Sequence, residues 1–459
     1  MEENQVLREQ VRILIEASDF RALRTILLQY PPADVAEFIS DIEPEDQGII
    51  FRILPQDLAT NTFGYLDHDA QTSLIGSLGS RRVAKILNEM NADDRTAFLE
   101  ECPAEVTKQL IMLLSTKERD VAVSLLGYPE NSVGRLMTPD FLTVKRDWSM
   151  ERVFSHVREH GRDTDMINVL YVVDEHGKLI DDIRIREILL AAPTLTIDHL
   201  CRDQFHALSA YQDKEEAVEA FKKYDRTALP VVDLQNHIVG IVTVDDVLDV
   251  AEEEATEDFQ KIAGMEALEE PFIKIPILRL VRKRAPWLVI LLIGQMLTAS
   301  AMGFFQDQIA KAVVLALFIP LIISSGGNSG SQAATLVIRA LSLGEVDASD
   351  WLRVVLRELL SGIILGCILA AVGFARIALW SAQTGAGGPP WEQLGVIVAT
   401  SVFCIVLWGS LIGALFPLLL HRLGFDPATS SAPFVATVVD VTGVVIYFSI
   451  GTLVLNTLP

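Results

Sequence analysis

Asp440 is the residue whose type and position most clearly suggest chemistry. It lies in the stretch PFVATVVDVTGVVIYF and is the one charged residue among residues 427–459. In a helix that starts at residue 427, it lies roughly 20 Å along the axis at 1.5 Å per residue. A carboxylate at such a depth in a membrane costs several kcal/mol unless it faces water, a cation or a basic partner. We interpret Asp440 as a cation site that lines a pore, with a buried lysine or arginine pair as the alternative.

Residues 320–335, PLIISSGGNSGSQAAT, form a second unusual apolar segment. They contain one proline and three glycines that would loosen a helix: Pro320, Gly326, Gly327 and Gly330. Freed carbonyls and the amides of Asn328 and Gln332 would then offer oxygen ligands. Small residues at this spacing equally favour close helix packing, and the sequence leaves both interpretations open. Oxygen ligands without a thiolate or imidazole cluster favour Mg²⁺ or a similar hard cation.

The third group of candidate residues is an acidic run between residues 245 and 258. Eight carboxylates fall within these fourteen residues: Asp245, Asp246, Asp249, Glu252, Glu253, Glu254, Glu257 and Asp258. In a helix, positions 246, 249, 253 and 257 share one face, and positions 254 and 258 share another. Two carboxylates 4 Å apart repel by about 4 kcal/mol at an effective dielectric constant of 20. The run therefore favours divalent cations as counter-charge, with a solvated charged face as the alternative.

Five apolar stretches follow the basic triplet at 282–284, over residues 285–305, 312–338, 359–375, 393–420 and 427–459. Each reaches about the 20 residues that a membrane span needs, the third with its polar flanks. No stretch offers Asp440 a basic partner at depth, because Lys311 and Arg376 lie toward outer ends. Basic residues gather at 282–284, in the loop 339–358 and at Arg422, so these segments are predicted to be cytosolic and the C-terminus outside.

Charge divides the chain in the same way. The 459 residues carry a net charge of −23, yet residues 285–459 hold only 8 acidic and 6 basic side chains, which leaves 53 acidic and 32 basic before residue 285. This pattern indicates an acidic, water-facing half joined to a membrane half, and argues against nucleic-acid binding. The charged N-terminus lacks the apolar core of a signal peptide. An enzyme is not expected, because no nucleophile–base pair, Walker motif or metal–histidine cluster occurs.

Residues 31–126 repeat with a period of twelve. The eight units open with Pro31, then residues 43, 55, 67, 79, 91, 103 and 115, and most of these are cap or first-turn residues. The last position of each unit is apolar, from Ile42 to Leu126, and so is the eighth in most units. We predict one short helix and a turn for each unit, stacked into an all-α superhelical solenoid.

Residues 137–200 and 201–255 contain two copies of one α/β unit. The segment LYVVDEHGKLIDDIRIREIL aligns with LPVVDLQNHIVGIVTVDDVL at an offset of 59, which pairs Val172 with Val231. Each copy is predicted to form strand, turn, strand and helix. The pattern resembles tandem cystathionine-β-synthase-type (CBS) domains, which often bind adenine nucleotides. Thr243 and Asp246 match the ribose-contacting pattern in the second copy, whereas the first copy has Asp181 and Arg184 at the positions of Gly240 and Thr243.

The order of these regions resembles the MgtE family of Mg²⁺ channels over essentially the entire chain. The segments GIVTVDDVLDVAEEEATED, PLIISSGGNSGSQAATLVIRAL and FDPATSSAPFVATVVDVTG carry the resemblance. It implies a multi-domain fold of an all-α superhelical solenoid, tandem α/β CBS domains and an all-α transmembrane domain of five helices. The implied divisions are an N-domain over 1–130, CBS domains over 137–200 and 201–256, a connecting (plug) helix over 257–282 and a pore domain over 283–459.

The resemblance also implies site residues. Asp440 is expected to bind Mg²⁺ in the pore of a homodimer, and Asp426 is expected at the cytosolic mouth. Gating carboxylates are expected throughout the soluble half: Asp93 in the N-domain, Asp213, Glu215, Asp225 and Asp246 in the CBS region, and Asp249, Glu254, Glu257 and Asp258 after it. The chain departs from the family at Ala97, where a second N-domain acid can occur, and at the basic pair Lys222–Lys223.

The predicted function is a Mg²⁺-selective channel or transporter that imports Mg²⁺ across the inner (plasma) membrane, with its N-terminus cytoplasmic. Mg²⁺ bridging the cytosolic carboxylates is expected to compact that half and close the pore, and ATP is a candidate ligand of the CBS domains. Predicted partners are a second copy, Mg²⁺ and membrane lipid, without nucleic acid. One alternative is a proton-coupled carrier of Mn²⁺ or Co²⁺, and another is a nucleotide-sensing membrane protein without a pore.

Overall fold

A computed structural model describes residues 11, 13–15, 17, 19–40, 42–162, 164, 166–268, 272, 275–306, 313–384 and 391–457. The chain divides into two compact units, Met1–Glu252 and Glu253–Pro459. Helix α15 (Val244–Ile262) runs through the division. Lys311, one of the basic residues considered for membrane orientation, lies outside the described residues.

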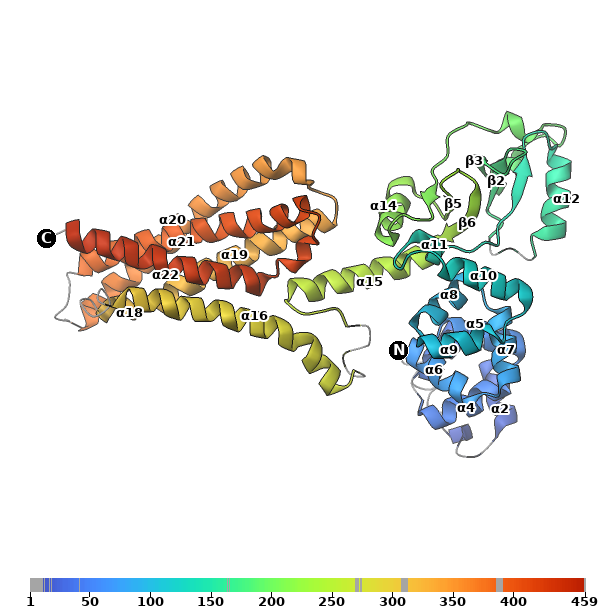
Figure 1. The fold of residues 1–459 in the computed structure, drawn as a ribbon, viewed down its shortest axis with the longest axis horizontal. Helices are drawn as coiled ribbons and strands as arrows, with labels where there is room; N and C mark the ends of the chain where they lie inside the picture. The colour runs from blue at the N-terminus through green and yellow to red at the C-terminus, as the bar shows by residue number, and fades with distance from the viewer. Residues whose placement is uncertain are drawn as a thin grey trace. The chain divides into compact units, whose positions relative to one another are not determined.

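Short helices build the beginning of the first unit (Figure 1). After α2 (Phe20–Leu27), one helix occurs in each twelve-residue unit: α3 (Pro32–Ser40), α4 (Pro44–Ile53), α5 (Gln56–Gly64), α6 (His68–Ser77), α7 (Ser80–Glu89), α8 (Ala92–Glu101), α9 (Ala104–Ile111) and α10 (Thr116–Leu126). Each begins one residue after its unit opens, so the helix starts are twelve residues apart. Asp67 and Ser115 cap their helices by accepting a backbone N–H.

The two repeated apolar positions form the core of these helices. Every residue at the eighth position is buried, from Phe38 to Ala122, and so are the last residues from Leu54 to Leu114. Helices two units apart pack on each other, as α3 does on α5 and α4 on α6. This stacking of equivalent units confirms the predicted helical N-domain and explains the period.

Two three-stranded sheets follow α11 (Val133–Leu136). The first contains β1 (Thr143–Lys145), β2 (Val169–Val173) and β3 (Leu179–Arg184), and the second contains β4 (Leu208–Ser209), β5 (Ala228–Val232) and β6 (Ile238–Thr243). In both, the first two strands are parallel and the last two antiparallel. The accompanying helices are α12 (Met150–His160), α13 (Ile185–Leu190), the 3₁₀ turn η1 (Ile197–His199), α14 (Lys214–Tyr224) and α15.

The predicted offset of 59 residues holds in the detailed register of the two sheets. Val172 pairs with Asp181 and Val231 with Gly240, and each sheet has a β-bulge immediately after that valine. Gly177 and Asn236, which are also 59 residues apart, turn the chain with positive φ. The copies meet at Lys178 and His237 and across a shared apolar cluster that includes Tyr171 and Ile241. These features confirm the tandem CBS architecture.

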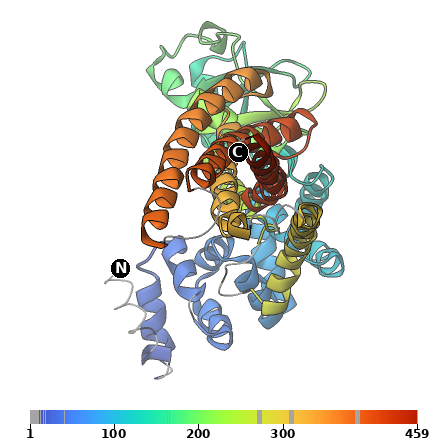
Figure 2. The same ribbon diagram turned by 90° about the vertical axis from the view of Figure 1, so that its left-hand side faces the viewer.

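Long apolar helices build the second unit, drawn in yellow to red in Figure 1 and Figure 2. They are α16 (Ile277–Phe304), the short α18 (Val313–Ala316) with α19 (Ile319–Ser342), α20 (Trp351–Thr384), α21 (Trp391–Arg422) and α22 (Ala432–Thr457), with 3₁₀ turns η2 (Ala348–Asp350) and η3 (Pro427–Thr429). Five segments are long and apolar enough to cross a membrane. The five-helix membrane domain is therefore confirmed.

The connecting helix predicted over 257–282 is wrong as a single helix. Helix α15 starts earlier and ends at Ile262, and the next helix begins at Ile277. Gly264 takes φ +77° and its N–H donates to the carbonyl of Lys261, while Met265 N–H donates to that of Gln260. This glycine-dependent closure satisfies the last carbonyls of α15 and ends it.

Candidate ion pathway and regulatory carboxylates

Asp440 lies on α22 with its carboxylate half-buried against two other membrane helices. The side-chain Nε2 of Gln295, on α16, donates to its Oδ2 at 2.8 Å. Its Oδ1 approaches the backbone of α19 at Gly327, where an added Cβ would lie 3.2 Å from that oxygen. Among the described ion pairs, none joins Asp440 to a lysine or arginine. The hydrogen-bond partner of this carboxylate is therefore the neutral side-chain amide of Gln295.

Helix α19 is continuous through its glycines, so they do not loosen it. Gly326 and Gly330 of α19 face Gly409 and Gly413 of α21. A Cβ on Gly413 would lie 2.2 Å from the Gly330 carbonyl oxygen, and one on Gly409 would lie 2.5 Å from the Gly326 oxygen. The structure therefore confirms close helix packing through small residues and contradicts the loosened helix, while amide ligands at Asn328 and Gln332 stay a prediction.

A second group of candidate residues meets around Asp426, which precedes η3. Lys261 Nζ lies 2.7 Å from Asp426 Oδ2 and 2.5 Å from an oxygen of Glu257, so one ammonium joins both carboxylates. Burial alone lowers the pKa of Lys261, but its hydrogen bonds to Asp426 and Glu257 raise the pKa above its ordinary value. Lys261 therefore stays charged, and it supplies the counter-charge here.

Asp258 belongs to the same neighbourhood as Asp426. Burial raises the pKa of its carboxyl group, and a hydrogen bond with Ser342 only partly offsets that rise. The charges of Asp426 and Glu257 raise the pKa further, while Lys261 lowers it. The sequence interpretation missed Lys261, although it is the single basic residue between positions 245 and 268 and lies four residues after Glu257.

Two of the predicted carboxylates of the first unit, Asp213 and Asp93, accept hydrogen bonds from nearby backbone N–H groups. Asp213 caps α14 by accepting from the N–H of Glu215 at 3.0 Å, and Glu215 itself is exposed. Asp225 ends α14 in the left-handed conformation at φ +48°. Asp93 is buried in the first turn of α8 and accepts from the N–H of Asp94 at 2.9 Å.

Helix α15 carries the remaining predicted ligands. Partial desolvation and the like charges of Asp245 and Glu252 raise the pKa of Asp249. Glu254 lies between Asp249 and Asp258 on the same helix. Within the described ranges, no three histidine, cysteine, aspartate or glutamate side chains converge as a metal centre. The structure thus joins Glu257 with Asp426 through Lys261 and brings Asp258 near them.

The candidate nucleotide residues Thr243 and Asp246 contact each other. Thr243 directly precedes α15, and its hydroxyl donates to the carboxylate of Asp246 in the first turn of that helix. The pair therefore lies at the start of α15, joined side chain to side chain.

In the first copy, Asp181 is buried and its Oδ2 accepts from the backbone N–H groups of Arg202 and Asp203, at 2.5 and 3.0 Å. The neighbouring Asp182 pairs with Arg226 at 2.7 Å. These groups border a hollow of about 160 Å³. Asp181, which stands where the second copy has Gly240, is thus part of the first copy's own hydrogen-bond network.

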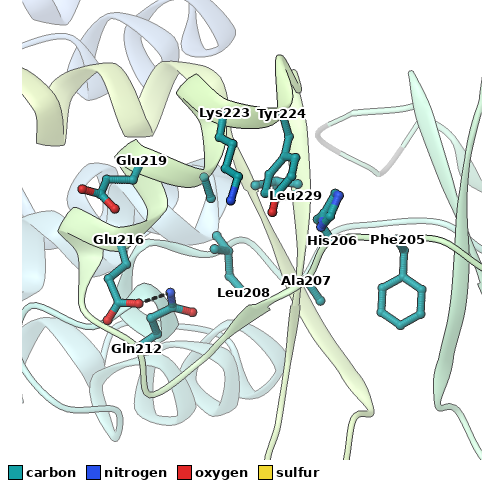
Figure 3. A pocket seen from close by; sticks show the side chains of 11 residues that line it. Phe205, His206, Ala207, Leu208, Gln212, Glu216, Glu219, Lys223, Tyr224 and Leu229 are labelled. Carbon is teal, nitrogen blue, oxygen red and sulfur yellow. Dashed lines mark hydrogen bonds between the residues drawn. The ribbon is translucent and has the colours of Figure 1, made fainter. Parts of the chain in front are cut away.

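A larger hollow of about 420 Å³ lies on the second copy, and Figure 3 shows the side chains that line it. His206 stacks on Tyr224 there, with ring centroids 3.5 Å apart. Gln212 and Glu216 hydrogen-bond across another part of its wall. None of the predicted site residues lines this hollow.

Family models match most of the chain in the order of its domains. The model described as the MgtE intracellular N domain matches residues 30–131, and the CBS domain model matches 133–193 and 197–253. The MgtE model described as a divalent cation transporter matches residues 319–450. Five membrane helices, a CBS pair and a helical N-domain thus define a membrane transport protein for divalent cations.

Whole-length relatives identify the family. The chain is 34% identical to the magnesium transporter MgtE of Thermus thermophilus over 96% of this chain and 97% of the relative. It is 29% identical to that of Bacillus subtilis over 98% and 97%, respectively. The chain belongs to the MgtE family of magnesium transporters, whose curated relatives are named as transporters and not as enzymes.

Solved structures resemble the non-membrane part. The cytosolic domain of the Mg²⁺ channel MgtE in complex with ATP has a TM-score of 0.51 and 31% identity, and the match covers 53% of this chain and 99% of that one. The soluble part of a magnesium transporter has the same TM-score at 21% identity and covers 55% and 99%. The second likeness supports the fold alone.

Proposed function

We propose that this protein is a Mg²⁺-selective channel or transporter in which Asp440 binds the ion within the membrane. The observation that carries the proposal is the half-buried carboxylate on α22, whose hydrogen-bond partner is the uncharged Gln295. A membrane carboxylate without a basic partner is stabilised best by a cation or by water. Mg²⁺ suits the site because it prefers oxygen ligands and keeps several of its waters.

We further propose that the pore forms between two copies of the chain. In one chain Gln295 is exposed and Asp440 is only half-buried, so one chain does not enclose the carboxylate. A second copy related by two-fold symmetry would bring a second Asp440 to the same path. The proposed setting is the plasma (inner) membrane, with import toward the side that bears the N-terminus and with the C-terminus outside.

Mg²⁺ flux into liposomes that contain the purified protein tests the ion site. Asp440→Ala is expected to reduce flux at least about a hundredfold, because it removes the charge that stabilises a cation in the membrane. Asp350→Ala is the matched control, since Asp350, the last residue of η2, is a carboxylate of the same unit and pairs with Arg353 in the first turn of α20. Wild-type flux in Asp440→Ala would contradict the proposal.

The rival proton-coupled carrier of Mn²⁺ or Co²⁺ makes a different prediction in the same liposomes. A channel for Mg²⁺ carries flux that follows the Mg²⁺ gradient and the membrane potential, whether or not a proton gradient is present. A carrier coupled to protons needs that gradient and acidifies or alkalises the lumen as it transports. Mg²⁺ flux that stops when the proton gradient is dissipated would favour the rival.

For regulation, we propose that Mg²⁺ on the side of the N-domain closes the pore by binding carboxylates there. The contact among Glu257, Lys261 and Asp426 supports this. Its two carboxylates lie close together beside η3 and are held by the positive charge of Lys261. The other proposed ligands are the carboxylates named by family resemblance: Asp93, Asp213, Glu215, Asp225, Asp246, Asp249, Glu254 and Asp258. Closure requires that the closed state bind Mg²⁺ more tightly than the open state.

Limited proteolysis over a Mg²⁺ series tests the regulatory proposal. We expect millimolar Mg²⁺ to protect the segment 250–285, because neutralised carboxylates favour a compact state. Ca²⁺ at equal ionic strength and a monovalent salt control for screening. Cleavage that is independent of Mg²⁺ would contradict regulation while leaving the ion site at Asp440 untouched.

ATP binding by the CBS pair is a second proposal. The observation in its favour is the relative that was solved in complex with ATP and that is 31% identical to this chain. Titration calorimetry of the full protein with ATP, and with Thr243→Val as the variant, is the test. Heat of binding that disappears in this variant would support Thr243 as a ligand, and no heat with the wild type would contradict the proposal.

A further inference from the structure

Gln295 is held in one orientation by a neighbour on its own helix. Its Oε1 accepts a hydrogen bond from the hydroxyl of Thr298 at 3.3 Å, and Thr298 is only 8% exposed. Because the carbonyl end of the amide is engaged by a hydroxyl, its NH₂ end is directed toward Asp440, where it donates at 2.8 Å. Thr298, Gln295 and Asp440 therefore form a directed chain of hydrogen bonds from α16 to α22.

This chain of bonds leaves the two oxygens of Asp440 in different situations. Oδ2 accepts from Gln295, whereas Oδ1 lies beside Gly327 of α19. Oδ1 can lie this close to the helix backbone because Gly327 has no side chain. A Cβ at this position would lie 3.2 Å from Oδ1. Oδ2 already uses one lone pair to accept from Gln295, so binding of a cation by both oxygens must compete with that bond, whereas contact through Oδ1 need not.

We infer that Gln295 is a positioning residue that restricts Asp440 to single-oxygen contact and thereby favours Mg²⁺ over Ca²⁺. Ca²⁺ accepts six to eight oxygens and often takes both oxygens of a carboxylate. Mg²⁺ requires a smaller octahedral shell and retains water, so one carboxylate oxygen suffices. The inference rests on the proposed ion site at Asp440 and adds the residue that sets its selectivity.

The test compares the Ca²⁺ concentration that halves Mg²⁺ flux with the Mg²⁺ concentration that half-saturates it. Gln295→Met keeps a similar length and removes the donor, and it is expected to lower the ratio of these two concentrations at least about fivefold, since hydrogen bonds to charged groups are the stronger ones. Thr298→Val removes the hydroxyl that orients the amide, and a drop of about twofold is expected. Ser300→Ala is the control, because the Ser300 hydroxyl donates to the carbonyl of Met296 on its own helix.

The outcomes separate this inference from the proposed function. Normal flux in Asp440→Ala would overturn both. Lost flux in Asp440→Ala with an unchanged ratio in Gln295→Met would overturn the inference alone. If Gln295→Met does not fold, Thr298→Val decides, because it removes one hydroxyl from a helix that remains apolar, and an unchanged ratio in that variant would overturn the inference. A lowered ratio in Gln295→Met, or in Thr298→Val where Gln295→Met does not fold, supports the inference if Ser300→Ala is unaffected.

Discussion

The carboxylate at Asp440 and the carboxylates around Asp426 differ in how their charge is compensated. Asp440 accepts from a neutral amide across two membrane helices. Glu257 and Asp426 share the ammonium group of Lys261, which is part of the protein. In the proposed function, the first arrangement suits an ion that passes through, because no protein cation among the described ion pairs competes for the carboxylate. The second suits a regulatory site, because Mg²⁺ must compete with a tethered lysine.

This comparison indicates where single substitutions have large effects. The proposed pore depends on one carboxylate and on the helices that hold it, so a change there affects transport as a whole. The regulatory carboxylates are numerous, and several are occupied as helix caps or in ion pairs, as Asp213 and Asp426 are. Their individual contributions are expected to be graded.

The largest effect is expected from a substitution at the glycine contact between α19 and α21, and it is an effect on stability. In Gly413→Val the first added atom would lie 2.2 Å from the Gly330 carbonyl oxygen, which is a backbone atom. We expect the variant to lose about 3 kcal/mol or more of folding free energy, which is in the upper range for overpacking. The yield of monodisperse protein in size-exclusion chromatography should fall accordingly. Gly303→Val is the matched control, because a Cβ there meets nothing within 4 Å. Equal yields of the two variants would contradict the packing account.

A smaller effect is expected from Asp426→Asn. Asparagine retains an oxygen that can accept from the Ala428 N–H, so the turn η3 is preserved while the charge is lost. The Mg²⁺ concentration that half-protects segment 250–285 from proteolysis is expected to rise about tenfold, as for the loss of one charge-assisted contact. Asp350→Asn makes the same chemical change away from this cluster. A midpoint that moves equally in both variants would show only an effect of net charge.

A still smaller effect, of opposite sign, is expected from Lys261→Met. Removal of the ammonium frees Glu257 and Asp426 for Mg²⁺, so the protection midpoint should fall, by roughly threefold for an exchange of one partly exposed ion pair. Lys261→Arg keeps the charge and should leave the midpoint nearly unchanged. If Lys261→Met raised the midpoint, the lysine would be a structural support of the closed state and not a competitor of Mg²⁺.

The local patterns of the sequence predicted the soluble unit in detail. The twelve-residue period placed the eight helices because each unit repeats the same two core positions. The offset of 59 located equivalent strands and even the paired positions Val172 and Val231. Local sequence also contained the signal that ends α15, Gly264, and the proline directly before α16, Pro276, but our interpretation of the acidic run overlooked both.

The local sequence patterns did not predict the contacts that define the candidate sites. Gln295 and Asp440 are separated by 145 residues, and Lys261 and Asp426 by 165. Neither Gln295 nor Lys261 belongs to a motif or repeat, and their partners depend on how the membrane helices pack. The composition of residues 320–335 likewise allowed two structures, and only the contact with Gly409 and Gly413 decides between them.

The central claim is that an ion site at Asp440 is separable from the proposed Mg²⁺-sensing carboxylates. Mg²⁺ flux and the Mg²⁺ midpoint of protease protection, measured on the same liposomes containing Asp440→Ala, test it most directly. We predict that flux falls to that of protein-free liposomes while segment 250–285 is protected at the wild-type Mg²⁺ concentration. Flux at the wild-type rate would contradict the assignment of the ion site, and lost protection would contradict the separation of the two.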